Sequence, residues 1–288
     1  MSKLRVGVVL PSLSTQRAEG IDLRVAARHA EQVGLASVWH GDHLAVGAPV
    51  LDITVGLATV AAVTERISIG TSVFVPAIRA LAWAAKQIAS LQEVSANRLI
   101  LGIGSGGGPE QWAAAGIPYA DRGRRTDEAL SLLPGLLAGK ETLIAGHPVT
   151  LQPAVPQPPF WIGNASPVAI RRAARLGNGW FPSLISPTQV AEGATELADL
   201  SAENHVIAIG TTGALGSGVR SQQELSAAIT KTYGTPAEGI PITGSPSEAA
   251  ARLATYAQAG AHHIVMGFAD SNWQTQCDLL AQATALLN

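Results

Sequence analysis

Cysteine and charge are scarce in this sequence. Its 288 residues include one cysteine, Cys277, and only 14% of them are charged. A single cysteine forms no internal disulfide and no thiolate cluster, which excludes a disulfide-stapled fold and predicts a small buried residue at Cys277. Nineteen Lys and Arg against 21 Asp and Glu give a net charge of −2. This balance provides no broad basic face for nucleic acid or an anionic membrane.

Long hydrophobic runs are missing as well. The apolar run that ends at Pro11 is too short for the core of a signal peptide. Residues 44–63 are interrupted by Pro49 and Asp52, so they are expected to include a buried helix and no membrane span. We therefore expect a cytoplasmic protein.

Short hydrophobic runs, in contrast, are frequent. Hydrophobic residues make up 47% of the chain, which excludes a disordered protein. A charged fraction far below the usual value of roughly 25% favours one large compact domain. Eight apolar runs occur, each followed by at least one helical pattern: 5–10, 37–40, 67–73, 98–103, 160–163, 179–181, 205–209 and 262–266. Near-continuous apolar strands are buried on both faces, so the sequence predicts an α/β fold, a single-domain (β/α)8 TIM-like barrel over residues 1–288.

Two segments depart from the regular alternation. Residues 146–159 are rich in proline and predict a hairpin excursion, whereas residues 210–219 are rich in glycine and predict a loop after the seventh strand. The second segment is a candidate for a mobile lid over the site.

The carboxyl ends of the strands are where a barrel of this kind carries its chemistry. His40, Asp42 and His43 follow the second strand, and a histidine beside a carboxylate suits general acid–base catalysis. The alternatives are a metal site, for which a third ligand at another strand end is missing, and a purely structural role, which is favoured for His40.

Glycines follow the fourth strand. Residues 102–108 contain the spacing G-x-G-x-x-G, but no acidic residue closes a following strand, so a dinucleotide fingerprint is disfavoured. The backbone of Gly104, Ser105, Gly106 and Gly107 would still let a flat ring or a phosphate lie directly on it, although a plain loop is the alternative.

A phosphate site is possible after the fifth strand. Gly163, Asn164 and Ala165 precede a helix that starts at Pro167, and Arg171 and Arg172 lie one turn further on. Simple helix capping by Ser166 is the alternative. Ser12, Ser72, Val73 and Trp180 also lie at strand ends.

Several segments resemble the bacterial luciferase-like superfamily of flavin- and F420-dependent oxidoreductases, in the right order over nearly the whole chain. They are AEQVGLASVW at 30–39 with Asp42 and His43, TERISIGTSV at 64–73, LQEVSANRLILGIG at 91–104, PPFWIG at 158–163 and GNGWFP at 177–182.

The resemblance implies a barrel that binds the deazaflavin F420 or FMN at its strand ends. It implies a non-prolyl cis peptide at Ser72–Val73 and a proton-transfer role for His43 with Asp42 as its neighbour. Glycines 104–107 and 163, with Asn164 and Ala165, would face the ring edge and the phosphate. Family members are often homodimers, so a homodimer is a possible assembly.

The chain departs from the family at three points. Gly107 stands where some F420 enzymes have a catalytic glutamate, with Glu110 as the nearest acid; Asn164 follows Gly163 where many members read Gly-Gly; and the chain is short. The first departure argues against a sugar-phosphate dehydrogenase, and the last favours the shorter F420-dependent group.

The leading hypothesis is hydride transfer between F420 and a small organic substrate. The alternatives are an FMNH2-dependent monooxygenase, a non-catalytic flavin-binding relative and a non-redox barrel enzyme. Because F420 has an acidic tail, it requires basic residues such as Arg79, Arg171 or Arg172 at the mouth of the site; without them FMN is favoured.

Overall fold

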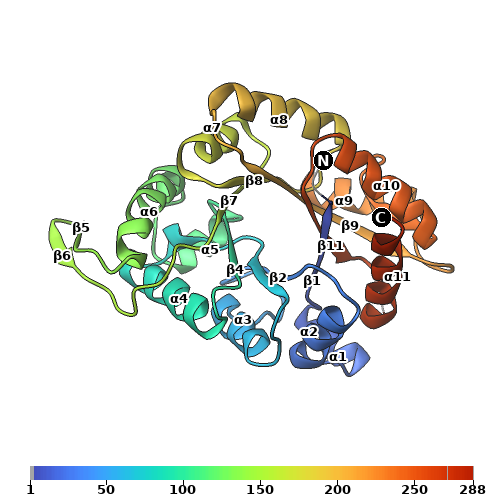
Figure 1. Ribbon diagram of the computed structural model, residues 1–288, viewed down its shortest axis with the longest axis horizontal. Coiled ribbons are helices and arrows are strands. Elements are labelled where there is room, and N and C mark those ends of the chain that lie inside the picture. The colour runs from blue at the N-terminus through green and yellow to red at the C-terminus, as the bar shows by residue number, and fades with distance from the viewer. Residues whose placement is uncertain (1–2, 271, 288) are drawn as a thin grey trace.

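Eight parallel strands close into a barrel in this computed structural model, which describes residues 3–270 and 272–287 (Figure 1). Around the barrel the order is β9, β11, β1, β2, β3, β4, β7 and β8, and β8 returns to β9. The strands are β1 (Arg5–Val9), β2 (Ser37–His40), β3 (Ser68–Thr71), β4 (Leu99–Ile103), β7 (Phe160–Gly163), β8 (Gly179–Phe181), β9 (Val206–Leu215) and β11 (His263–Phe268). The predicted (β/α)8 barrel is confirmed.

Helices form a ring outside the barrel (Figure 1). Many start at a residue whose side chain accepts a hydrogen bond from the first turn; Ser221 and Ser245, for example, form complete capping boxes with Glu224 and Glu248. The helices are α1 (Leu13–Glu19), α2 (Leu23–Gln32), α3 (Ile53–Ala61), α4 (Leu81–Val94), α5 (Pro109–Ala114), α6 (Arg122–Leu137), α7 (Pro167–Leu176), α8 (Pro187–Leu200), α9 (Gln222–Tyr233), α10 (Pro246–Gln258) and α11 (Trp273–Ala285).

The sequence predicts a loop over residues 210–219, and this prediction is wrong for the first half of the segment. Residues 210–215 continue β9, which pairs with the short strand β10 (Ile242–Gly244). An ideal Cβ at Gly213 would lie 1.9 Å from the carbonyl oxygen of Ile242, so this glycine allows close approach of two strands. The turn comes only at Gly216 and Gly218, whose φ angles are +93° and +74°.

An antiparallel hairpin formed by β5 (Thr142–Ile144) and β6 (His147–Val149) projects from the ring of helices (Figure 1). It starts slightly before the proline-rich segment at 146–159 and overlaps with its first residues. The following residues lead back to β7, and Val155 among them is buried in the core.

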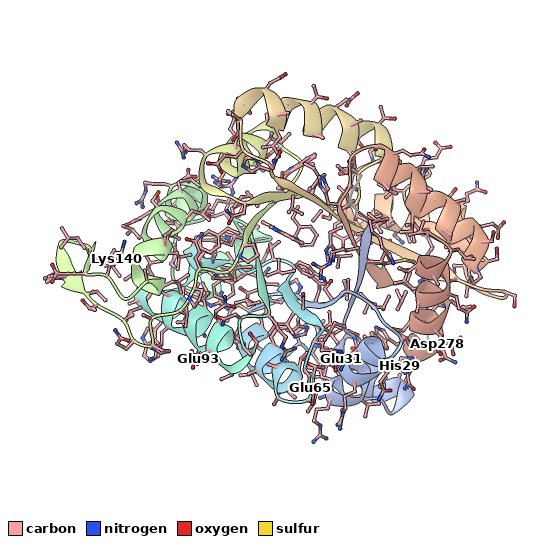
Figure 2. The ribbon with its side chains drawn as sticks, viewed as in Figure 1. His29, Glu31, Glu65, Glu93, Lys140 and Asp278 are labelled. Atoms are coloured by element: carbon pink, nitrogen blue, oxygen red, sulfur yellow. The ribbon has the colours of Figure 1, made fainter. Side chains whose placement is uncertain are left out.

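Polar contacts join the outer helices near the two ends of the chain. His29 on α2 lies beside Asp278 on α11, with 2.8 Å between Nε2 and Oδ1 (Figure 2). Glu31 on α2 accepts hydrogen bonds from the backbone N–H groups of Arg66 and Ile67 at 2.7 and 2.8 Å, just before β3. These contacts fix α2 against both neighbouring parts of the barrel.

The interior of the barrel is filled with aromatic rings and one buried histidine. Trp39 stacks on Trp161 with 5.5 Å between ring centroids, and Phe181 packs against both. The indole Nε1 of Trp39 donates to the hydroxyl of Ser37 at 2.7 Å, and this hydroxyl lies 2.7 Å from Nε2 of His263. The ring of His263 is buried beside this hydroxyl, where the charged form of the imidazole is disfavoured. Burial, with a smaller contribution from Arg5, lowers the pKa of His263 to about 3.

The depressed pKa of His263 predicts that the protein loses stability in mild acid. The unfolded chain protonates this histidine below pH 6.5 while the folded protein keeps it neutral, so stability is full above pH 6.5 and falls as the pH falls towards 3. Between pH 7.5 and 5 the free energy of unfolding should fall by about 2 kcal/mol from this residue. Urea unfolding of wild type and His263→Asn at both pH values measures the difference.

The exposed His147 supplies the control for this measurement. His147→Asn should keep the wild-type pH dependence, whereas His263→Asn should flatten it by the amount stated. Equal slopes in wild type and His263→Asn would contradict the assignment of a neutral buried imidazole.

Cys277 is a buried residue of α11, as predicted, and burial raises the pKa of its thiol above the usual value. None of the helices within 3–270 and 272–287 has the length and apolar character needed to cross a membrane.

Candidate active site

A cavity of about 830 Å³ opens at the carboxyl ends of the barrel strands. Val9, Val73, Phe181 and Val265 line it, and all four also belong to the apolar cluster inside the barrel. The cavity therefore rests directly on the aromatic filling of the barrel, which provides a rigid apolar floor.

Most of the predicted cofactor-binding residues lie together around this cavity. They come from the ends of β3, β4 and β7, which are neighbours in the sheet. The lining residues from this set are Ser72, Val73, Gly104, Ser105, Gly106, Gly163, Asn164 and Ala165. These residues lie side by side, as expected for a barrel whose site forms at the carboxyl ends of its strands.

Val73 lies at the centre of this group. The Ser72–Val73 peptide is cis, as the family resemblance implies. An ideal Cβ at Gly104 would lie 2.4 Å from Cγ2 of Val73, and one at Gly163 would lie 3.0 Å from its Cγ1. Both glycines are therefore required to seat the Val73 side chain, because a larger residue at either position would collide with it.

Asn164 explains one departure from the family pattern. Its φ angle of +87° lies in the left-handed region, which glycine adopts freely and asparagine tolerates better than most residues. Its side-chain Oδ1 accepts from the N–H of Ser166 at 2.8 Å, which orders the start of α7. Asparagine thus fulfils the conformational role of the second glycine at this position.

Trp180 does not line the cavity. Side chains alternate along β8, so Phe181 faces the barrel interior and Trp180 faces outward, where an ideal Cβ at Gly193 of α8 would lie 2.1 Å from its ring. Its indole Nε1 donates to the carbonyl oxygen of Asn164 at 2.9 Å. Trp180 therefore lies behind the cavity loop, outside the lining, and holds that loop through Asn164.

The carboxylate of Asp42 binds Arg79. Its two carboxylate oxygens accept from Nη1 and Nη2 of Arg79 at 2.6 and 2.7 Å, and Oδ2 also accepts from the N–H of Val75 at 2.9 Å. The side chain of Asp42 is 3% exposed and that of Arg79 is 17% exposed. The expected pairing of Asp42 with His43 is not found among the described contacts; the carboxylate instead holds the loop after β3 to the loop after β2.

His43 is not among the residues that line the cavity; it lies on the loop that Asp42 fixes. An ideal Cβ at Gly41 would lie 2.9 Å from Nε2 of His43 and 3.7 Å from the carbonyl oxygen of Ser72, so the ring folds back beside Ser72. Gln111 on α5 accepts from the N–H of Leu44 at 2.9 Å and anchors the same loop. The ring is exposed.

His40 faces the opposite way, towards Gly56 of α3. It is largely buried, and burial lowers its pKa. Its Nε2 has no hydrogen-bond partner in the described structure. This placement matches the structural role favoured for it.

Ser12 and Gly107 are outside the cavity lining. Ser12 is the N-cap of α1, where its hydroxyl accepts from the N–H of Thr15. Gly107 lies beside the amide of Gln111, and the carboxylate of Glu110 folds back towards Gly108. Glu110 is not a lining residue, so it does not replace the glutamate that Gly107 lacks.

The arginines expected at the mouth are elsewhere. Arg79 pairs with Asp42, and Arg171 and Arg172 line a separate surface groove of about 470 Å³, where Arg172 binds Asp127 at 2.7 Å. Among the described residues that line the main cavity, none is Asp, Glu, Lys, Arg or His. The cavity is therefore uncharged.

Another part of the cavity wall was missed from the sequence. It consists of residues from the loop after β8 and from α9 and the loop that follows it: Leu184, Ile185, Ile229, Tyr233, Pro236 and Ala237. The helical pattern of 222–232 was visible in the sequence, but nothing in it shows that this helix folds over the barrel mouth.

No metal site was found in the described part of the chain: no three His, Cys, Asp or Glu side chains are placed together to hold an ion.

The chain is thus a closed (β/α)8 barrel protein with an uncharged, glycine-walled cavity at its strand carboxyl ends, the rim where barrel enzymes carry their sites. Comparison with known proteins gives the family. The profile of the luciferase-like monooxygenases matches residues 5–213, so the chain belongs to that family.

Three similar proteins show what this chain resembles. An uncharacterized protein of Mycobacterium tuberculosis (strain ATCC 25618 / H37Rv) is 37% identical over 141 residues, and this match spans 47% of the chain and only 49% of that relative. An F420-dependent glucose-6-phosphate dehydrogenase of Amycolatopsis mediterranei (strain U-32) is 27% identical over 85% of the chain and 87% of that protein. The solved structure of an F420-dependent secondary alcohol dehydrogenase in complex with an F420–acetone adduct superposes with a TM-score of 0.82, at 15% identity and 99% coverage of both chains.

Proposed function

We propose that this protein is an F420-dependent oxidoreductase that transfers a hydride between the deazaflavin and a small organic substrate. One observation carries the proposal: a cavity of about 830 Å³ is lined by uncharged, glycine-rich backbone at three neighbouring strand ends. The relatives named as F420-dependent enzymes support the choice of cofactor.

The residues present fit such a cofactor. Val73, seated between Gly104 and Gly163, would support one face of the ring system. The hydroxyls of Ser72 and Ser105 and the backbone around Ala165 offer uncharged groups for the ring edge and the phosphate. Bound F420 would supply a ring carbon that accepts or donates a hydride. The protein would hold substrate and ring together, and His43 would exchange the proton that accompanies the hydride.

FMN is the second candidate. None of Arg79, Arg171 and Arg172 lines the cavity to meet the acidic tail of F420, and this observation favours FMN, whereas the relatives named as F420-dependent enzymes favour F420. Titration of the protein with F420 and with FMN, followed by tryptophan fluorescence, decides between them. We expect tighter binding of F420. Tighter binding of FMN would favour the monooxygenase, binding without turnover would favour a flavin-holding relative, and binding of neither would favour a non-redox enzyme.

A glycine substitution tests whether the titrated site is the cavity. Gly104→Ala should weaken cofactor binding at least tenfold, because the new methyl group would displace Val73. Gly123→Ala on α6 is the matched control, since the nearest atom to its ideal Cβ is 4.0 Å away. Equal affinities in the two variants would place the cofactor elsewhere.

A homodimer is the assembly we propose. Val55 and Trp83, in the first turns of the adjacent helices α3 and α4, are 60% and 70% exposed, and Leu44 nearby in sequence after β2 is 54% exposed. If these side chains form one contiguous apolar patch, they would serve as the contact surface of such a dimer. Trp83→Glu should convert a dimer to a monomer in size-exclusion chromatography with light scattering, whereas Leu143→Glu on the β5–β6 hairpin, which exposes a comparable side chain, should leave the dimer intact.

The composition and the single buried cysteine support placement of this enzyme in the cytoplasm.

A further inference from the structure

We propose that a second ligand site lies in the ring of helices and takes a small phosphate monoester with an apolar part. The site is the groove of about 470 Å³ between α6, α7 and α8, and it shares no lining residue with the cavity at the strand ends. Its volume lies within the range of about 300 to 1,000 Å³ that small-molecule sites occupy. The residues of α7 that line it with charge or bulk share one helix face, since they are spaced by three and four positions: Val168, Arg171, Arg172 and Arg175.

Positive charge exceeds negative charge in this groove. Three arginines line it against one carboxylate, that of Asp127 on α6, so the net charge of the lining is +2 while that of the whole chain is −2. Arg171 and Arg175 lie four positions apart on the helix, where two like charges repel each other. A bound anion would remove this repulsion.

The carboxylate of Asp127 is already bound by Arg172. Nε of Arg172 donates to Oδ1 at 2.7 Å, and Nη2 donates to Oδ2 at 3.4 Å. The side chain of Arg172 is only 9% exposed, so this pair forms a fixed part of the groove.

The other two guanidinium groups keep N–H donors for a ligand. Arg175 approaches Oδ1 of Asp127 only to 3.6 Å, which is too long for a hydrogen bond. Arg171 is exposed and makes no hydrogen bond or ion pair in the ranges that the structure describes. The groove therefore presents two cationic groups, one helical turn apart, whose donors face solvent.

A phosphate monoester matches these two groups. It carries a charge of roughly −1.5 to −2 at pH 7, and its oxygens accept the paired N–H groups of a guanidinium. Val168 and Leu200, the last residue of α8, line the same groove and are 52% and 47% exposed. An apolar substituent on the phosphate would cover these side chains, so the groove should prefer an organic phosphate to inorganic phosphate.

Isothermal titration calorimetry with phenyl phosphate and with inorganic phosphate tests the site. At low salt we expect phenyl phosphate to bind at least tenfold more tightly than inorganic phosphate, with an affinity that falls as salt is added. Equal affinities of the two phosphates, or binding of neither, would overturn the proposal. Binding of vesicles that contain phosphatidic acid, without binding of phenyl phosphate, would assign the groove to a membrane and overturn it as well.

Two matched arginine variants locate the bound phosphate. Arg175→Gln should weaken the binding of phenyl phosphate at least fivefold, because one of the two free cations is lost. Arg124→Gln on α6 is the control: the side chain of Arg124 is 65% exposed against 68% for Arg175, but it pairs with Asp121 and Glu128 and does not line the groove. Both side chains are exposed, so both variants should fold. Equal affinities in the two variants would place the phosphate elsewhere.

A further pair of variants tests the apolar wall. Val168→Ser should weaken the binding of phenyl phosphate about threefold and leave that of inorganic phosphate unchanged. Val25→Ser on α2, where the valine is 44% exposed and lies outside the groove, should change neither affinity. An unchanged affinity for phenyl phosphate in Val168→Ser would contradict a ligand with an apolar part.

Discussion

His43→Ala is expected to lower kcat by a factor of about 100 and to leave the melting temperature unchanged. A general acid or base contributes a rate factor of this size, and water takes over the proton transfer when its side chain is removed. The melting temperature should stay because the ring is exposed and lies close to Gly41 on a surface loop. Steady-state kinetics and thermal unfolding measure the two quantities.

Two further variants separate proton transfer from general disturbance of the surface. Gly41→Ala should lower kcat in the same direction, because its methyl group would force the His43 ring away from Ser72. His147→Ala, on the distant β5–β6 hairpin, removes another exposed imidazole and should change nothing. A wild-type kcat in His43→Ala would end its assignment as the proton-transfer group.

The barrel was predictable because its strands obey a simple physical rule. Strands such as β4 (Leu99–Ile103) are buried on both faces and read as unbroken apolar runs, so their number and order follow from the sequence. The same rule failed at residues 210–215, where glycines mark close strand contact at Gly213, because glycine signals a turn and a close approach alike.

The part of the site that the strand ends form was predictable from the sequence. Ser72, Gly104 and Asn164 meet because parallel strands that are neighbours in the barrel end at the same rim. Trp180 was predicted to lie in the site, but side chains alternate along β8, so Trp180 faces outward and its neighbour Phe181 faces inward. The apolar wall from α9 depends on how a helix folds over the mouth, which is a long-range contact that local patterns do not encode.

The partner of Asp42 was also beyond the sequence. Spacing placed Asp42 beside His43, one residue away, whereas its carboxylate binds Arg79, 37 residues further on. Arg79 in turn covers the ring of Phe74 at 4.6 Å and donates to the carbonyl oxygen of Val75 at 3.0 Å. The pair therefore connects the loop of His43 to the loop that follows Val73.

Asp42→Ala is expected to lower the free energy of unfolding by about 3 to 5 kcal/mol, the cost of removing one partner from a buried ion pair. The side chain of Arg79 is only 17% exposed, so its charge would remain buried and unpaired, and the N–H of Val75 would lose its acceptor. Urea unfolding followed by circular dichroism gives the value.

Asp22→Ala is the matched control, because Asp22 also binds an arginine through its carboxylate, Arg24 at 2.6 Å. That pair is exposed and screened by water, so the loss of the ion pair together with the N-cap of α2 that Asp22 provides should cost clearly less than the loss at Asp42. If both variants lost the same small amount, the Asp42–Arg79 pair would not hold the two loops together. A loss in Asp42→Ala well above that of Asp22→Ala, with kcat falling as well, would identify Asp42 as the residue that positions His43.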